Sequence, residues 1–96
     1  MPDTAEKIMS LTLADFHRSI KALAPDLVAQ EGQTTFTVVE GDTDVLIRYE
    51  PLEKATLGGL LAMPRARVTI EHGNLDTSRC KAFLARFDRA FQRGGG

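Results

Sequence analysis

Residues 34–49, TTFTVVEGDTDVLIRY, decide the fold of this chain. Two runs rich in β-branched residues flank Gly41-Asp42, a pair suited to a two-residue hairpin turn. If Glu40 pairs with Thr43 around that turn, three further pairs face one another: Val38 and Val45, Phe36 and Ile47, and Thr34 and Tyr49. Most of the large apolar side chains in this register fall on one face, and a buried face fixes the register of a strand pair. The stretch therefore predicts a β-hairpin with one face in a hydrophobic core.

Further strands are predicted on both sides of this hairpin. Upstream, Leu27–Gln30 precedes Glu31-Gly32, a second turn with glycine where a positive φ is favourable. This segment is expected to pair with the first strand of the hairpin. Downstream, residues 65–72 alternate between apolar Val68 and Ile70 and polar neighbours, a pattern typical of a half-buried strand. Together these segments predict an antiparallel sheet of about four strands.

The connection formed by residues 51–64 has the least regular pattern. It contains two prolines and Gly58-Gly59, which favour a bent loop. A short strand around Leu60–Met63 is the alternative interpretation.

Two amphipathic helices are predicted, one on each side of the strand region. The first begins at Thr12, an N-cap with Asp15 in the capping-box position, and ends before Pro25, whose ring disfavours helical geometry in the preceding residue. The second runs from residue 76 or 77 to about residue 93. Each helix carries one apolar stripe: Leu13, Phe16, Ile20 and Leu23 on the first, and Cys80, Phe83, Leu84, Phe87 and Phe91 on the second.

These elements predict an α+β fold, a two-layer sandwich with the element order α-β-β-β-β-α. Only one face of the sheet is consistently apolar, so both helices are expected to cover that face. Residues 12–93 are expected to form this single domain, preceded by a loose N-terminal segment, residues 1–11, and followed by a glycine tail, residues 94–96.

The composition is that of an ordinary globular protein. Of the 96 residues, 43% are hydrophobic and 26% are charged. No apolar run is long enough to cross a membrane, and the first residues lack the basic start and apolar stretch of a signal peptide. The single cysteine, Cys80, cannot form an internal disulfide, which favours a reducing compartment. The expected location is the cytoplasm.

Charge is distributed unevenly along the chain, although the net charge is only −1. Residues 1–63 carry five Lys/Arg and ten Asp/Glu, whereas residues 64–96 carry seven and three. One arc of the second predicted helix holds the candidate anion-binding residues Arg79, Arg86, Arg89 and Arg93. The alternative is a solvated helix face.

A nucleic-acid interface is disfavoured by where these groups are expected to lie. The helix arginines should point away from the sheet, while Arg65 and Arg67 should leave its opposite face, so they make no single patch. All six aromatic residues are assigned to the core, which removes the rings on which single-stranded bases stack.

The sequence contains no signature of catalysis, metal binding or a nucleotide cofactor. No CxxC, HExxH, GxSxG or phosphate-loop motif occurs. Cys80 lies between Arg79 and Lys81, which favours a reactive thiolate, but its place on the apolar stripe indicates a buried, inert cysteine. His17 and His72 belong to no ligand cluster. We therefore expect neither enzyme activity nor a cofactor.

The chain ends in three glycines, and Gly95-Gly96 resembles the terminal handle of ubiquitin-like and sulfur-carrier proteins. That resemblance implies a carrier that is conjugated or thiolated at Gly96. In those proteins the glycines follow a strand of a β-grasp fold, whereas here they follow a predicted helix, where one glycine serves as a cap. The alternative is a frayed terminus.

The remaining candidate surface is apolar. Several hydrophobic residues have no assigned place in the core: Val39, Leu46, Leu57, Leu60, Leu61 and Met63. They either form a surface for a partner, or they complete the core when residues 51–64 fold back over the sheet. The leading hypothesis is a small non-enzymatic domain for protein–protein interaction or self-association. A carrier using Gly95-Gly96, and weak binding of nucleic acid or an acidic partner through the helix arginines, are the alternatives.

Overall fold

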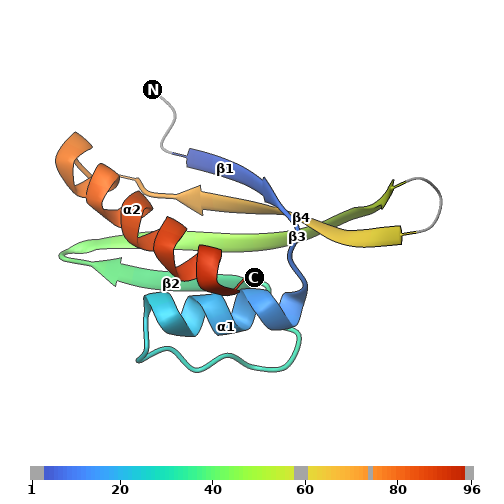
Figure 1. Cartoon of the computed structure of the whole chain (residues 1–96). Helices are drawn as coiled ribbons and strands as arrows, with labels where there is room; N and C mark the ends of the chain where they lie inside the picture. Colours follow the sequence, from blue (N-terminus) through green and yellow to red (C-terminus); the bar gives the residue numbers. More distant parts are fainter. Residues whose placement is uncertain (1–3, 58–60, 74, 95–96) are drawn as a thin grey trace.

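The computed structural model describes residues 4–57, 61–73 and 75–94. Its elements, in chain order, are β1 (Thr4–Met9), α1 (Leu13–Leu23), β2 (Thr35–Glu40), β3 (Thr43–Leu57), β4 (Leu61–Glu71) and α2 (Thr77–Gly94). The four strands form one antiparallel sheet in the order β1-β4-β3-β2. Both helices lie on the same face of that sheet, as Figure 1 shows. The predicted α+β class, with a four-stranded antiparallel sheet and two helices, is confirmed.

The predicted register of the central hairpin is also confirmed. Glu40 is the partner of Thr43 in β2 and β3, and the apolar pairs follow from that. The pairs include Val38 with Val45 and Phe36 with Ile47. At the far end the Tyr49 backbone N–H donates to the Thr34 carbonyl at 2.8 Å.

One predicted strand is replaced by another. Residues 1–11 are not a loose segment throughout, because Thr4–Met9 pairs along β4 from Thr4 opposite Glu71 to Met9 opposite Ala66. Leu27–Gln30 forms no strand, so the element order is β-α-β-β-β-α. The sheet still has four strands.

The segment before β2 turns where expected but does not enter the sheet. The turn at Glu31-Gly32 forms, with Gly32 at φ 77° and the Gln33 N–H donating to the Gln30 carbonyl at 3.0 Å. His17 Nε2 of α1 lies 2.7 Å from the Gln33 carbonyl oxygen. This contact ties the turn to α1, so the preceding residues are not aligned with the edge of β2.

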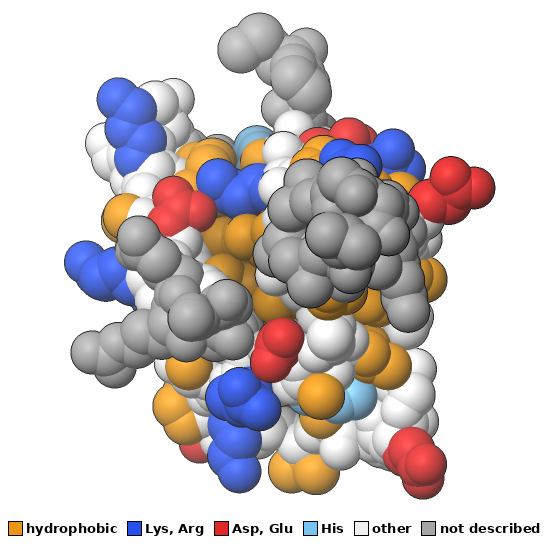
Figure 2. Space-filling view, turned by 45° about the vertical axis from the view of Figure 1, so that its right-hand side comes forward, with side chains coloured by type: hydrophobic (Ala, Val, Ile, Leu, Met, Phe, Trp, Pro, Cys, Tyr) orange, Lys and Arg blue, Asp and Glu red, His pale blue; other side chains and the backbone are white. Residues whose placement is uncertain are grey.

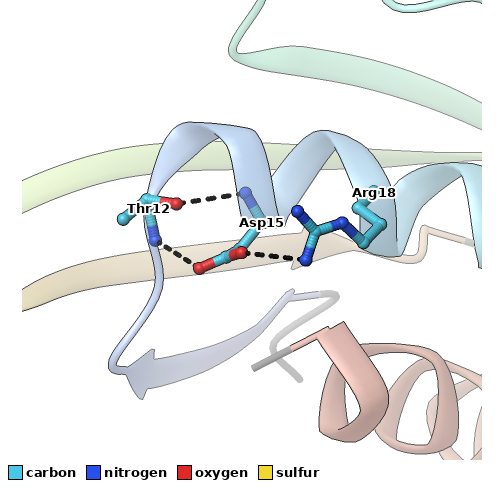
Figure 3. Close-up of polar contacts among 3 residues, drawn as sticks. All are labelled: Thr12, Asp15 and Arg18. Atoms are coloured by element: carbon cyan, nitrogen blue, oxygen red, sulfur yellow. Dashed lines mark hydrogen bonds and ion pairs between the residues drawn. The ribbon is translucent and has the colours of Figure 1, made fainter. Parts of the chain in front are cut away.

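Helix α1 begins with the predicted capping box, drawn in Figure 3. The Thr12 side chain accepts from the Asp15 N–H at 3.1 Å, and the Asp15 carboxylate accepts from the Thr12 N–H at 3.5 Å. Arg18 donates to the same carboxylate at 3.3 Å. The box satisfies two of the N–H groups that a helix start leaves unpaired.

The hydrophobic core lies between the helices and the inner face of the sheet. Phe16 of α1 is at its centre, with ring centroids 5.2 to 5.9 Å from those of Phe36, Tyr49 and Phe91. The predicted stripe of α2 supplies the rest: Phe83, Phe87 and Phe91 are buried, and Cys80 and Leu84 pack against them half-buried. All six aromatic residues therefore contribute to the core, as predicted, with Tyr49 at its border.

Residues 51–64 differ from the predicted bent connection. Residues 51–57 continue β3 and residues 61–64 begin β4, so that a two-stranded ribbon runs past the ends of β1 and β2 (Figure 1). We call residues 52–65 the extension. Its described residues, 52–57 and 61–65, have no flanking strand, because β1 ends opposite Ala66 and β2 begins opposite Arg48. The molecule is accordingly long and thin, with dimensions of 47 × 30 × 19 Å.

Two prolines fit this ribbon because of where their missing N–H groups would point. The Tyr49 N–H points toward β2, and the backbone nitrogen of Pro51, two residues further along β3, faces the same side. At Pro51 no residue of β2 lies on that side, because β2 starts at Thr35, opposite Arg48. By the same alternation, Pro64 faces the side of β1 beyond Met9. A register shift between Leu52 and Ala55 accommodates an extra residue of β3 at this point. Proline is tolerated on such open edges, since no ladder hydrogen bond is lost.

Candidate interaction surfaces

The outer face of the sheet is polar and carries a network of ion pairs. Arg67 lies between two carboxylates, with Nη1 3.0 Å from Glu50 and Nε 3.4 Å from Glu6. Arg48 lies 3.6 Å from Glu71. These pairs are largely solvent-exposed, so each contributes about 0–1 kcal/mol and weakens with salt. This face is therefore a solvated surface with alternating charges.

The predicted partner surface separates into two distant parts. Val39 is 66% exposed near the β2–β3 turn, and Leu46 is half-buried beside the ion pairs. Leu57, Leu61 and Met63 belong to the extension at the other end of the ribbon, and Leu60 lies outside the described residues. Leu57 lies eleven positions after Leu46 along β3, a distance of about 36 Å in an extended strand. The described residues of this set therefore cannot serve one compact interface.

The extension has a distinctive composition. Residues 55–64 contain no charged residue, although Glu53, Lys54 and Arg65 lie at the base. Leu57 is the register partner of Leu61, and Ala55 is the partner of Met63. Positions two apart in a strand belong to the same face, so these four residues occupy one face of the ribbon. A contiguous row of apolar positions lies where neither helix covers the sheet (Figure 1).

Two of the helix arginines, Arg79 and Arg86, do not point away from the sheet as predicted. Arg79 reaches the β2–β3 turn, donating to the Glu40 carbonyl at 2.9 Å and lying 3.7 Å from the Asp42 carboxylate. Arg86 donates to the Glu40 carboxylate at 2.7 Å and lies over the Phe83 ring. Both cations hold α2 against the edge of the sheet, so they are occupied by the protein itself.

Gly41 shows how close this approach is. Its φ is 65°, the left-handed region that favours glycine, and a Cβ atom at this position would collide with the Arg79 guanidinium. Glycine at this position therefore leaves space for the Arg79 side chain beside the turn.

The rest of the predicted anion surface is reduced to one described side chain. Arg89 is exposed on α2, and the side chain of Arg93 lies outside the described part of the chain. In Figure 2 basic and acidic side chains are interspersed with hydrophobic ones on the face shown. The three described arginines do not form the continuous basic surface that binding to a phosphate backbone requires.

The cysteine and histidine considered for catalysis or metal binding lie in contact with other parts of the fold. Cys80 is half-buried against the core, and His17 contacts the turn before β2. Within the described residues no three His, Cys, Asp or Glu side chains gather as metal ligands would. None of the described helices has the length and hydrophobicity to span a membrane. Gly95-Gly96, the proposed carrier terminus, lies outside the described residues, and α2 extends to Gly94.

Tyr49 is a titratable group with a shifted pKa at the border of the core. Burial raises the pKa of its phenol above 10.0, and the negative charge of Asp15 raises it further. Its hydroxyl donates to the Leu11 carbonyl at 3.4 Å. These surroundings favour the neutral phenol, which suits a packing role at the last covered layer before the extension.

Two shallow grooves border Pro25 and Leu27. One, of about 360 Å³, lies against α1 and includes His17 and Arg18. The other, of about 370 Å³, lies along β2, where Thr37 and Val39 form one wall. Neither contains a cluster of catalytic groups, but the second leaves open space beside a sheet edge.

Comparison of the chain with protein-family models, with curated proteins and with solved structures finds no match to any of them.

Proposed function

We propose that this protein is a small non-enzymatic interaction domain that binds a protein partner or a second copy of itself through the extension, residues 52–65. The observation that carries the proposal is the ribbon itself, which continues past both flanking strands and is not covered by either helix. An uncovered pair of strands gains little from burial, so its length is not explained by the stability of the domain.

The composition of the extension supports the same role. Its uncharged stretch, residues 55–64, contrasts with the charged outer face of the sheet. Apolar residues are typical of binding sites, because a partner can remove them from water. The prolines Pro51 and Pro64 face the two edges at its base, which disfavours indiscriminate strand addition there. Binding is therefore expected to use the apolar face of the ribbon.

Paired substitutions test this proposal. The variant Leu57→Ser with Leu61→Ser makes one cross-strand pair polar, while Thr56→Ser with Ala62→Ser changes the adjacent pair and serves as the matched control. We expect the leucine variant to lose self-association in sedimentation velocity, or to lose a partner that wild type and control both recover from source lysate. Both variants should unfold at the same urea concentration as wild type. Equal association of wild type, leucine variant and control would reject the proposal.

A further inference from the structure

We infer that the free edge of β2 pairs with β2 of a second copy, forming a continuous sheet across a two-fold axis. This edge is separate from the extension, because β2 begins opposite Arg48 and runs away from the extension toward the β2–β3 turn (Figure 1). The argument begins from the edges of the sheet, because an unpaired edge presents backbone donors and acceptors that another strand can satisfy.

The other described edges carry features that oppose strand addition. On β1, Lys7 lies on the helix side of the sheet, where its Nζ is 3.1 Å from Asp88 of α2. A charge directed inward from an edge strand disfavours pairing with another strand, since the incoming strand would help to bury it. At the base of the extension, Pro51 and Pro64 remove a donor from each side.

The β2 edge has none of these features. The sequence of β2, TFTVVE, contains no proline, no lysine and no bulge. The backbone groups of its even-numbered residues face β3 and form the hydrogen bonds between the two strands. The N–H and carbonyl groups of Thr35, Thr37 and Val39 therefore point outward, away from β3. Among the described contacts, only the Thr35 carbonyl has a partner on this side, the Gln33 amide at 2.9 Å. A groove of about 370 Å³ runs beside Thr37 and Val39, and residues 23–27 form its other wall.

A second β2 strand is the occupant that matches this edge. Antiparallel pairing about Thr37 sets Thr37 opposite its own copy and Val39 opposite Thr35, and all three residues have outward backbone groups. Glu40, the single charge of β2, falls opposite Thr34, so no like charges meet. Val39, which is 66% exposed in one copy, gains a neighbour across the axis. The strand is thus complementary to itself in backbone hydrogen bonding, in charge and in exposed apolar surface.

Cysteine crosslinking tests the register directly. In a Cys80→Ser background, Thr37→Cys should form a covalent dimer on oxidation, because a Cα separation of about 5.5 Å across such a pair permits a disulfide. Thr35→Cys alone and Val39→Cys alone should crosslink far less, because each of these residues lies opposite the other one in the second copy. The double variant, which carries both cysteines, should crosslink well. Equal crosslinking of all single variants would overturn the inference.

Sedimentation equilibrium provides a measurement that needs no cysteine. Thr37→Pro removes an outward N–H without breaking a bond to β3 and should raise the dimer dissociation constant about tenfold or more, while Thr37→Val should not. Circular dichroism checks that both variants are folded. A wild-type protein that stays monomeric at its highest soluble concentration would overturn the inference. A dimer abolished by Leu57→Ser with Leu61→Ser, but unaffected at Thr37, would assign association to the extension instead.

Discussion

The β3–β4 hairpin consists of two parts with the same backbone pairing and opposite surroundings. In the covered part, Val45, Ile47, Val68 and Ile70 are fully buried beneath the helices. In the extension the ladder continues from Leu52 to Leu57, yet no helix or flanking strand accompanies it. Burial beneath the helices explains the apolar side chains of the first part. Our proposal assigns stability to the covered part and recognition to the extension.

The strongest test of this contrast truncates one large apolar side chain in each of the two parts of the molecule. Phe87→Ala empties a fully buried position facing the covered part and should lower the free energy of unfolding by about 3–5 kcal/mol. Leu61→Ala in the extension should lower it by less than about 1 kcal/mol. Urea denaturation measures both. A comparable loss for the two variants would mean that the extension belongs to the folding core.

A smaller effect is expected at Tyr49, where the covered part ends. Unfolded Tyr49 ionises near pH 10.0, whereas burial and Asp15 raise its pKa in the folded protein. Between those two pKa values the unfolded chain has lost a proton that the folded protein keeps, so stability falls as pH rises through this window and is unaffected below it.

The variant Tyr49→Phe isolates this contribution. It should lose less stability than wild type as pH rises through and above 10.0, a difference below about 1 kcal/mol for this half-exposed group. Urea unfolding at matched ionic strength measures the difference. Parallel pH profiles for the two proteins would show that the phenol is not held neutral by the fold.

The parts of the fold that could be predicted are those in which local chemistry and burial agree. The hairpin register followed from Phe36, Val38 and their partners, because a one-residue slip would expose the whole apolar face. The α1 start followed from Thr12 and Asp15, which satisfy backbone donors over three residues of sequence.

The errors arose where distant contacts decide the structure. The β1 strand depends on pairing with β4, more than 55 residues away, and its pattern contains the inward-facing Lys7. Pro51 and Pro64 indicated a loop, although both are compatible with a strand whose edge is open. The helix arginines were assigned to solvent because helical spacing cannot show that Glu40 and Asp42 lie within reach. Long-range pairing is not encoded in any short window of sequence.

The central claim, that the extension is dispensable for folding and required for association, is tested most directly by removing it. Leu52 and Arg65 are register partners in backbone contact, so replacing residues 53–64 with Asn-Gly would close the hairpin at that pair with a turn of the favoured type. We predict a free energy of unfolding within about 1 kcal/mol of wild type, together with loss of the association that the leucine substitutions also abolish. A loss of several kcal/mol, or persistence of any association other than the Thr37-dependent pairing of β2, would contradict the account.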